Sequence, residues 1–279
     1  MTRPSLGEVR RHCAEGRYFS YEGLNDRMFA PVSVFLVWVF VRLGWSGHAV
    51  SLLSGAAVAA GGALLASGNP LLVFVGSFGY LSFYLLDYVD GGVARFRKQA
   101  GISGQYVDWL MHVVAAVGTA AGLFAGALPV VGNWIVPFGL LSVLAAALAL
   151  DRYALGWFSI CMHHQQRQSR GEAGAPVPAA IRAETRGRAR RLLRNASTAL
   201  FHESYMIYTL PVFGAAHLLA WTGPFDFRVV LTVLGGALYF PVVLFDIWTM
   251  ATSGRVDRAY ERLFFGTSSP KLPEDHYFG

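Results

Sequence analysis

Charged residues are scarce in this chain: Asp, Glu, Lys and Arg make up 14% of its 279 residues, whereas hydrophobic residues make up 54%. Because a soluble domain usually carries about 25% charged residues, the composition excludes an ordinary soluble protein. Cys13 and Cys161 are the only cysteines, which excludes a disulfide framework and a multi-cysteine metal site. Glycine is abundant, with 31 residues and no triplet period, and this favours closely packed membrane helices over a collagen-like chain.

The N-terminal segment also lacks the apolar stretch that a signal peptide has. Residues 1–30 carry mixed charges, so we expect no signal peptide. The apolar stretch that follows, 31–43, is too short to span a bilayer, which takes around 20 helical residues. It predicts an interfacial helix lying along the membrane surface.

Six longer apolar segments predict an all-α integral membrane protein with six transmembrane helices. Each segment is near the length that a helix needs to cross about 30 Å of hydrocarbon. The segments cover residues 49–66, 70–86, 105–125, 131–150, 204–221 and 228–250.

The distribution of basic residues predicts the orientation of these spans. With the N-terminus in the cytoplasm, 22 of the 23 Lys and Arg lie in cytoplasmic segments, and only Arg228 does not. Basic residues favour the cytoplasmic side of a membrane, so both termini are predicted to be cytoplasmic. Because topology accounts for the positive charge, we expect no nucleic-acid partner.

This topology divides the chain into three parts. Residues 1–48 are a cytoplasmic N-terminal segment with the interfacial helix. Residues 49–250 are the six-helix membrane domain, which includes the cytoplasmic basic loop 151–203, and residues 251–279 are a cytoplasmic tail. In a bacterial cell we expect the protein in the inner, or plasma, membrane.

Three aspartates and a histidine surround the predicted turn between the second and third spans. Asp87 and Asp90 are three residues apart, and Asp108 and His112 are four apart, so each pair shares a helix face. Because the two helices are antiparallel neighbours, we expect the four side chains to converge at the cytoplasmic end of the bundle. Ionisable residues at membrane depth are costly and usually functional, and helix capping would explain only one or two of these.

Such a group needs a cation, since uncompensated carboxylates at this depth would repel one another or become neutral. Oxygen ligands suit hard ions such as Mg²⁺, which binds through one or two carboxylates plus substrate phosphates. Small residues nearby leave room for a ligand, namely Gly91, Ala94 and Gly104. The guanidinium group of Arg95 adds positive charge and paired N–H donors that suit phosphate. The group predicts a metal-bridged diphosphate site that opens to the cytoplasm.

The spacing of these residues resembles the signature of the CDP-alcohol phosphotransferase family. That signature has two Asp, a Gly, an Ala-Arg pair, a second Gly and two further Asp at the same spacing. The matching residues are Asp87-x2-Asp90-Gly91-x2-Ala94-Arg95-x8-Gly104-x3-Asp108-x3-His112. The six predicted spans and the interfacial helix extend the resemblance over most of the chain.

The resemblance implies an enzyme that transfers a phosphoalcohol from a CDP-linked donor to an acceptor hydroxyl and releases CMP, in phospholipid or related phosphodiester synthesis. It implies that divalent metal, Mg²⁺ or Mn²⁺, is held on the donor diphosphate by Asp87, Asp90 and Asp108. The implied nucleotide-binding residues are Gly91, Ala94, Arg95 and Gly104. Metal on a diphosphate aligns it and neutralises charge on the leaving CMP, and hydroxyl attack on phosphorus relies mainly on such positioning.

His112 stands where the resemblance has the last Asp, a general base that also belongs to the metal cluster. Three interpretations are open. His112 is the catalytic base, because the ordinary pKa of imidazole is closer to neutral pH than that of a carboxyl group. Alternatively it is a metal ligand, and the site then favours Mn²⁺ or Zn²⁺ over Mg²⁺. In the third interpretation the reaction is lost, and the chain is a nucleotide- or lipid-binding membrane protein of the same fold.

A second departure precedes the first predicted span. Many family members carry a Pro-Asn-x-x-Thr stretch there, whereas this chain has Gly47-His48-Ala49-Val50-Ser51. Ser51 keeps a hydroxyl, but His48 replaces the amide. Two histidines in two family landmarks indicate a divergent branch with an unusual substrate.

The expected partners are a CDP-linked donor, an alcohol or lipid acceptor and membrane lipid. The sequence leaves open whether the lipid is donor or acceptor, and whether the chain forms a homodimer. A transporter would place charged or broken helices near the bilayer midplane, whereas the acids here lie at one edge, which disfavours transport.

The predicted topology has a direct test. A reporter fused after Gly279 should be located in the cytoplasm, because the basic residues of the tail favour that side of the membrane. The measurement compares a phosphatase reporter with a fluorescent one in intact cells. An external signal would contradict the orientation.

Overall fold

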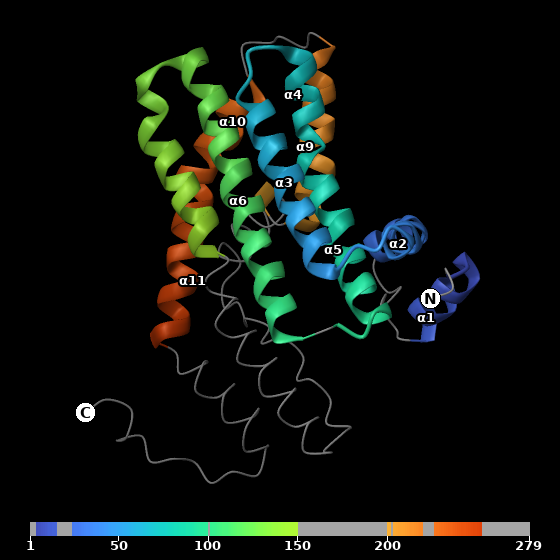
Figure 1. The fold of residues 1–279 in the computed structure, drawn as a ribbon. Coiled ribbons are helices and arrows are strands. Elements are labelled where there is room, and N and C mark those ends of the chain that lie inside the picture. Colours follow the sequence, from blue (N-terminus) through green and yellow to red (C-terminus); the bar gives the residue numbers. More distant parts are fainter. Residues whose placement is uncertain are drawn as a thin grey trace, which may run out of the picture.

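The computed structural model describes residues 4–15, 24–99, 101–149, 200–201, 203–219 and 226–252. These residues form a bundle of helices, and no strand occurs among them (Figure 1). The helices are α1 (Leu6–Glu15), α2 (Leu24–Arg42), α3 (Gly47–Leu65), α4 (Pro70–Ser77), α5 (Gly79–Phe96), α6 (Ile102–Val131), the 3₁₀ turn η1 (Asn133–Ile135), α9 (Glu203–Leu218), α10 (Phe227–Leu234), the π-helical turn η2 (Gly235–Tyr239) and α11 (Phe240–Thr252). A further apolar helix lies within Asn133–Ala149. The predicted loop 151–203 and tail 251–279 fall almost wholly outside the described residues.

Four helices are long and apolar enough to cross a membrane. They are Gly47–Leu65, Pro70–Phe96, Tyr106–Val131 and Phe227–Trp248, which match the predicted first, second, third and sixth spans. The counterparts of the fourth and fifth spans are Asn133–Ala149 and α9, and both are shorter within the described residues. The all-helical fold is therefore confirmed, with four helices of spanning length where the sequence predicts six.

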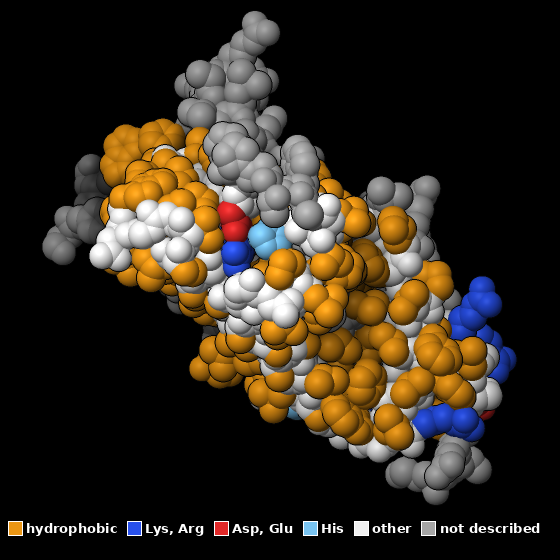
Figure 2. All heavy atoms as spheres, turned by 90° about the horizontal axis from the view of Figure 1, so that it is seen from above, with side chains coloured by type: hydrophobic (Ala, Val, Ile, Leu, Met, Phe, Trp, Pro, Cys, Tyr) orange, Lys and Arg blue, Asp and Glu red, His pale blue; other side chains and the backbone are white. Residues whose placement is uncertain are grey.

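The outer surface of the bundle is largely apolar. Hydrophobic side chains cover most of the face seen in Figure 2, and charged side chains are few there. Several large hydrophobic side chains are more than half exposed, among them Leu52, Leu71, Leu140, Val212 and Trp248. Apolar surface of this extent suits hydrocarbon surroundings better than water.

Helix α3 lies at the centre of the bundle because its glycines let two neighbours approach closely. A Cβ atom at Gly61 would lie 2.6 Å from the Cα atom of Gly79 on α5. On the other side, a Cβ atom at Gly62 would lie 2.5 Å from the carbonyl oxygen of Gly118 on α6. Backbone contact through small residues is a usual way to pack helices in membranes. It fixes α5 and α6, the helices that carry the predicted site, against one common support.

Polar caps set where helices begin in this apolar chain. The hydroxyl of Ser46 accepts a hydrogen bond from the backbone amide of Ala49 at 3.2 Å and starts α3. The side chain of Asn69 accepts one from the amide of Leu71 at 2.9 Å, and Pro70 occupies the first position of α4. Such caps satisfy amides that the helix itself leaves unpaired.

Helix α2 begins earlier than the sequence predicts, at Leu24 and not at Pro31. Its polar first turn is held by tertiary hydrogen bonds: the amide nitrogen of Asn25 donates to Tyr84 on α5 at 3.3 Å, and Tyr208 on α9 donates to the Asn25 oxygen at 2.6 Å. These bonds extend the helix into the mixed-charge segment, which hydrophobicity alone could not reveal.

Helix α2 also differs from the other long helices in direction. Figure 1 shows it nearly end-on, so it lies across the axes of α3, α5 and α6. One face is packed against the protein through Ala30, Ser33, Val37 and Val41. The opposite face exposes Met28, Val32 and Phe35. The helix is therefore apolar on both faces, with one of them outside the protein core.

Helix α1 completes this end of the molecule. Val9 and Cys13 are buried in a cluster with residues of α2 and α5, and the ring of His12 packs edge-on against Phe96 at 5.2 Å. Cys13 is a free thiol, and burial raises its pKa. The thiol is therefore protonated and shielded, as expected for a structural cysteine.

At the other end of α3, Arg228 forms a buried ion pair. Its guanidinium contacts the carboxylate of Asp226 at 2.6 Å and also donates to the carbonyl oxygens of Leu65 and Ser67. Burial would raise the pKa of Asp226, but the hydrogen bonds and charge of Arg228 outweigh it and hold that pKa below its ordinary value. The one basic residue that the predicted topology places outside thus has a structural role.

The glycine contacts predict that one added methyl group destabilises the protein at Gly122 but not at Gly118. In Gly122→Ala the new Cβ atom would overlap the backbone of Gly62, so α3 and α6 must separate. We expect a loss of about 1–3 kcal/mol of stability, measured by thermal unfolding in detergent. Gly118→Ala is the control one turn away, since its nearest neighbouring atom is 3.9 Å distant. Equal stability of the two variants would contradict the close packing.

Candidate metal centre

The site lies where α5 and α6 approach each other near the turn that joins them. Asp87 is near the middle of α5 and Asp90 lies three residues later, while Asp108 and His112 are in the first part of α6. The two helices run antiparallel (Figure 1). Of the four side chains that the sequence predicts to converge, three meet and Asp90 is not among them.

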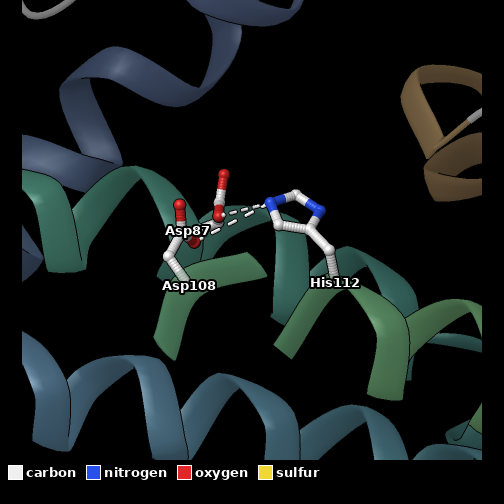
Figure 3. Close-up of side chains that lie close together, drawn as sticks. All are labelled: Asp87, Asp108 and His112. Atoms are coloured by element: carbon white, nitrogen blue, oxygen red, sulfur yellow. Dashed lines mark ion pairs between the residues drawn. The ribbon is translucent and has the colours of Figure 1, made fainter. Parts of the chain in front are cut away.

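Three of these side chains meet. The Nε2 atom of His112 lies 3.1 Å from Oδ1 of Asp87 and 3.8 Å from Oδ1 of Asp108. One donor atom from each residue lies within 4.8 Å of both others. Figure 3 shows the imidazole directed toward the two carboxylates. Among the described residues, this group has the composition and spacing to hold a metal ion.

The group is partly shielded from solvent. The side chains of His112, Asp87 and Asp108 are 18%, 24% and 37% exposed, so the group remains accessible to a ligand although most of it is covered. Two carboxylates this close repel each other when both are ionised, and a cation between them removes that repulsion. The arrangement can therefore bind a divalent ion and keep part of its coordination open to another ligand.

Aromatic rings hold the imidazole in place. The ring of Phe83 meets that of His112 edge-on, with centroids 5.0 Å apart and planes at 84°. Trp109 lies on another side, with its centroid 5.8 Å away. These contacts fix the plane of the imidazole. Neither residue was predicted as part of the site, although Trp109 directly follows Asp108 and Phe83 precedes Asp87 by four positions.

Asp90 lies apart from this group. It is only 7% exposed, and its Oδ2 atom receives a hydrogen bond of 2.5 Å from the hydroxyl of Ser51 on α3. Ser51, whose hydroxyl the sequence analysis noted only as a retained feature, thus connects α3 to α5 directly beside the site. The sequence gives no indication of this partner, because 39 residues separate the two.

The predicted nucleotide-binding residues differ in their surroundings. The Arg95 guanidinium folds back over Gly91, where a Cβ atom would lie 2.9 Å from both of its terminal nitrogens. Gly104 has open space around it, with no atom within 4 Å of an added Cβ. Ala94 packs against α3, since its methyl group lies 2.8 Å from where a Cβ of Gly47 would be. Gly91 therefore provides room for the Arg95 guanidinium and Gly104 leaves open space, while Ala94 supports the packing of α3 against α5.

A network of hydroxyl groups adjoins the site and has no counterpart in the sequence analysis. The hydroxyls of Tyr84 and Tyr88 on α5 are 3.3 Å apart. Asn25 of α2 connects Tyr84 to Tyr208 of α9. The only hint of this network in the sequence is that Tyr84 and Tyr88 lie on either side of Asp87. The network ties α2 and α9 to the helix that carries the carboxylates.

No model of a known protein family matches the chain, and no curated protein is significantly similar to it. The interpretation of the site therefore depends on its residues and on the spacing of the motif.

The Ser51–Asp90 contact predicts a measurable cost. Ser51→Ala removes the hydroxyl that donates to the buried Asp90 carboxyl group, and the loss of such a partner destabilises a protein by about 1–3 kcal/mol. Ser51→Thr should keep most of the stability, because it keeps the hydroxyl. Ser54→Ala is the matched control, since the Ser54 hydroxyl bonds only to the backbone oxygen of Ser51 on its own helix. Thermal unfolding of the purified variants distinguishes them, and equal melting of Ser51→Ala and Ser54→Ala would contradict the assigned contact.

Proposed function

We propose that the chain is an integral membrane transferase that moves a phosphoalcohol from a CDP-linked donor to an acceptor hydroxyl and releases CMP. The product would be a phospholipid or a related phosphodiester. The observation that carries this proposal is the meeting of Asp87, Asp108 and His112 at one end of an apolar helical bundle. The motif that surrounds these residues supports the same reaction.

The donor set fits a divalent cation such as Mg²⁺ or Mn²⁺. Carboxylate oxygens are ligands for both Mg²⁺ and Mn²⁺, and imidazole is a ligand that suits Mn²⁺ better than Mg²⁺. When bound, a divalent ion at such a site aligns a diphosphate and offsets the charge that develops on the leaving phosphate. Asp87 and Asp108 would hold it, while Asp90, bonded to Ser51, supports the end of α5 from the α3 side.

The remaining residues orient the substrates. Arg95 presents a guanidinium close to Gly91, where it can bind a donor phosphate through two parallel hydrogen bonds. The open space at Gly104 allows the nucleotide to approach the backbone of α6. Phosphoryl transfer depends mainly on placing donor and hydroxyl in line, so residues that hold both substrates supply most of what the reaction needs.

The membrane gives this site its access routes. We place the site and both chain termini on the cytoplasmic side, α2 in the interface and six helices across the bilayer. The exposed apolar face of α2, with Met28, Val32 and Phe35, supports an interfacial position. A water-soluble nucleotide would enter from the cytoplasm and a lipid substrate from the inner leaflet.

A second candidate is a nucleotide- or lipid-binding membrane protein without turnover. The observation that favours it is the contact of His112 Nε2 with both carboxylates, because a nitrogen engaged in this way is not available as a base. Such a protein would bind metal and nucleotide but release no CMP.

The proposed reaction is tested by CMP release from purified protein in lipid. The donors are CDP-diacylglycerol and CDP-choline, the metals are Mg²⁺ and Mn²⁺, and the acceptors are a lipid and polar-metabolite extract. Asp108→Asn and Asp87→Asn should each lower the rate by at least about 100-fold, because each removes a carboxylate that would hold the metal ion needed to offset charge on the leaving phosphate.

The control for this experiment is Glu8→Gln, on the exposed side of α1, which should leave CMP release unchanged. Thermal unfolding of each variant verifies that loss of activity is not loss of fold. Metal-dependent nucleotide binding without CMP release across the whole panel would replace the transferase by the second candidate.

A further inference from the structure

The metal centre contains one donor of a different kind from the others. Asp87 and Asp108 offer carboxylate oxygens, and His112 offers the imidazole nitrogen Nε2. Hard ions such as Mg²⁺ prefer oxygen ligands and an octahedral shell rich in water. Imidazole is a better ligand for ions of the first transition row, and affinity for mixed nitrogen and oxygen sites rises along that row. The donor set therefore bears on which ion the centre selects.

We propose that His112 is a metal ligand through Nε2 and that the centre binds a divalent transition-metal ion, such as Mn²⁺ or Zn²⁺, more tightly than Mg²⁺. This deepens the proposed function and rests on it for the use of the ion, but not for its binding. It also assigns His112 one of the three roles that the sequence leaves open. The role of base then does not belong to Nε2.

The spacing of the donor atoms supports a single shared ion. Ligand atoms about 2.1 Å from one metal stand about 3.0 Å apart at right angles and about 3.4 Å apart at tetrahedral angles. Nε2 of His112 is 3.1 Å from Oδ1 of Asp87 and 3.8 Å from Oδ1 of Asp108. Small side-chain rotations would therefore bring all three donors to one ion.

The surroundings of the imidazole favour the ligand role. The rings of Phe83 and Trp109 hold its plane, and Figure 3 shows that this plane directs the ring edge at both carboxylates. A base that accepts a proton from a substrate hydroxyl must face that hydroxyl. Nε2 faces Asp87 and Asp108 instead, as a coordinating nitrogen would.

The position of Asp90 keeps the donor set mixed. A third carboxylate in the group would shift it toward an all-oxygen shell. Asp90 is buried and accepts a hydrogen bond of 2.5 Å from Ser51 on α3, and it is not among the three residues whose donor atoms meet. The group of one nitrogen and two oxygens is thus accompanied by a hydrogen bond that engages the third carboxylate with α3.

The experiment measures metal binding to the purified full-length protein after removal of metal with a chelator. Mn²⁺ is titrated with electron paramagnetic resonance detection, and Mg²⁺ and Zn²⁺ are added as competitors. We expect Mn²⁺ and Zn²⁺ to bind at least about 10-fold more tightly than Mg²⁺. Pulsed resonance of the bound Mn²⁺ should detect coupling to an imidazole nitrogen.

Two variants make the result specific. His112→Asp should remove the nitrogen coupling and bring the affinities for Mn²⁺ and Mg²⁺ within a few-fold of each other. His217→Gln is the control, because His217 packs on Phe227 beside the other end of α3, and it should keep the wild-type coupling and selectivity. If His112→Asp fails to fold, the nitrogen coupling in the wild type decides the question alone.

The outcomes separate this inference from the proposed function. Comparable affinities for Mn²⁺ and Mg²⁺, or bound Mn²⁺ without nitrogen coupling, would overturn the ligand role of His112, even if the protein releases CMP with Mg²⁺. Selective Mn²⁺ binding with nitrogen coupling but no CMP release would support the metal assignment and remove the transferase.

Discussion

The backbone contact of α3 with α5 on one side and α6 on the other governs the rest of this structure. Gly61 and Gly79 have no room for a side chain where they meet, and Gly62 has none where it meets the backbone of Gly118. Water does not drive helices together inside a membrane, so close packing and interhelical hydrogen bonds must do so. The contact holds α5 and α6 at a fixed separation, and the Asp87 carboxylate of α5 therefore faces the His112 imidazole and the Asp108 carboxylate of α6.

The sequence predicted the parts of the fold that depend on local pattern. Apolar length predicted helices of spanning length, and the spacing of Asp108 and His112 predicted a shared helix face. Tertiary contacts could not be predicted in the same way. The start of α2 at Leu24 depends on hydrogen bonds from Asn25 to Tyr84 and Tyr208, whose partners are far away in the chain.

The same limit applied to the site. Three acids near one turn were expected to act together, but the structure groups Asp87 and Asp108 with His112 and turns Asp90 toward Ser51. Spacing along a helix gives the face on which a residue lies, and Asp87 and Asp90 share a face only loosely, because three residues turn the helix by about 300°. Which neighbour each acid contacts depends on where the adjacent helix stands, and no periodicity contains that information.

The pairing of Arg228 with Asp226 has a consequence for how the bundle assembles. Only one residue separates the partners, so the ion pair can form as soon as the first turn of α10 does, before α3 is in place. A buried guanidinium is costly unless its charge is paired and its donors are bonded. The nearby carboxylate can compensate Arg228 locally first, and the Leu65 and Ser67 carbonyl groups accept its remaining donors once the bundle assembles.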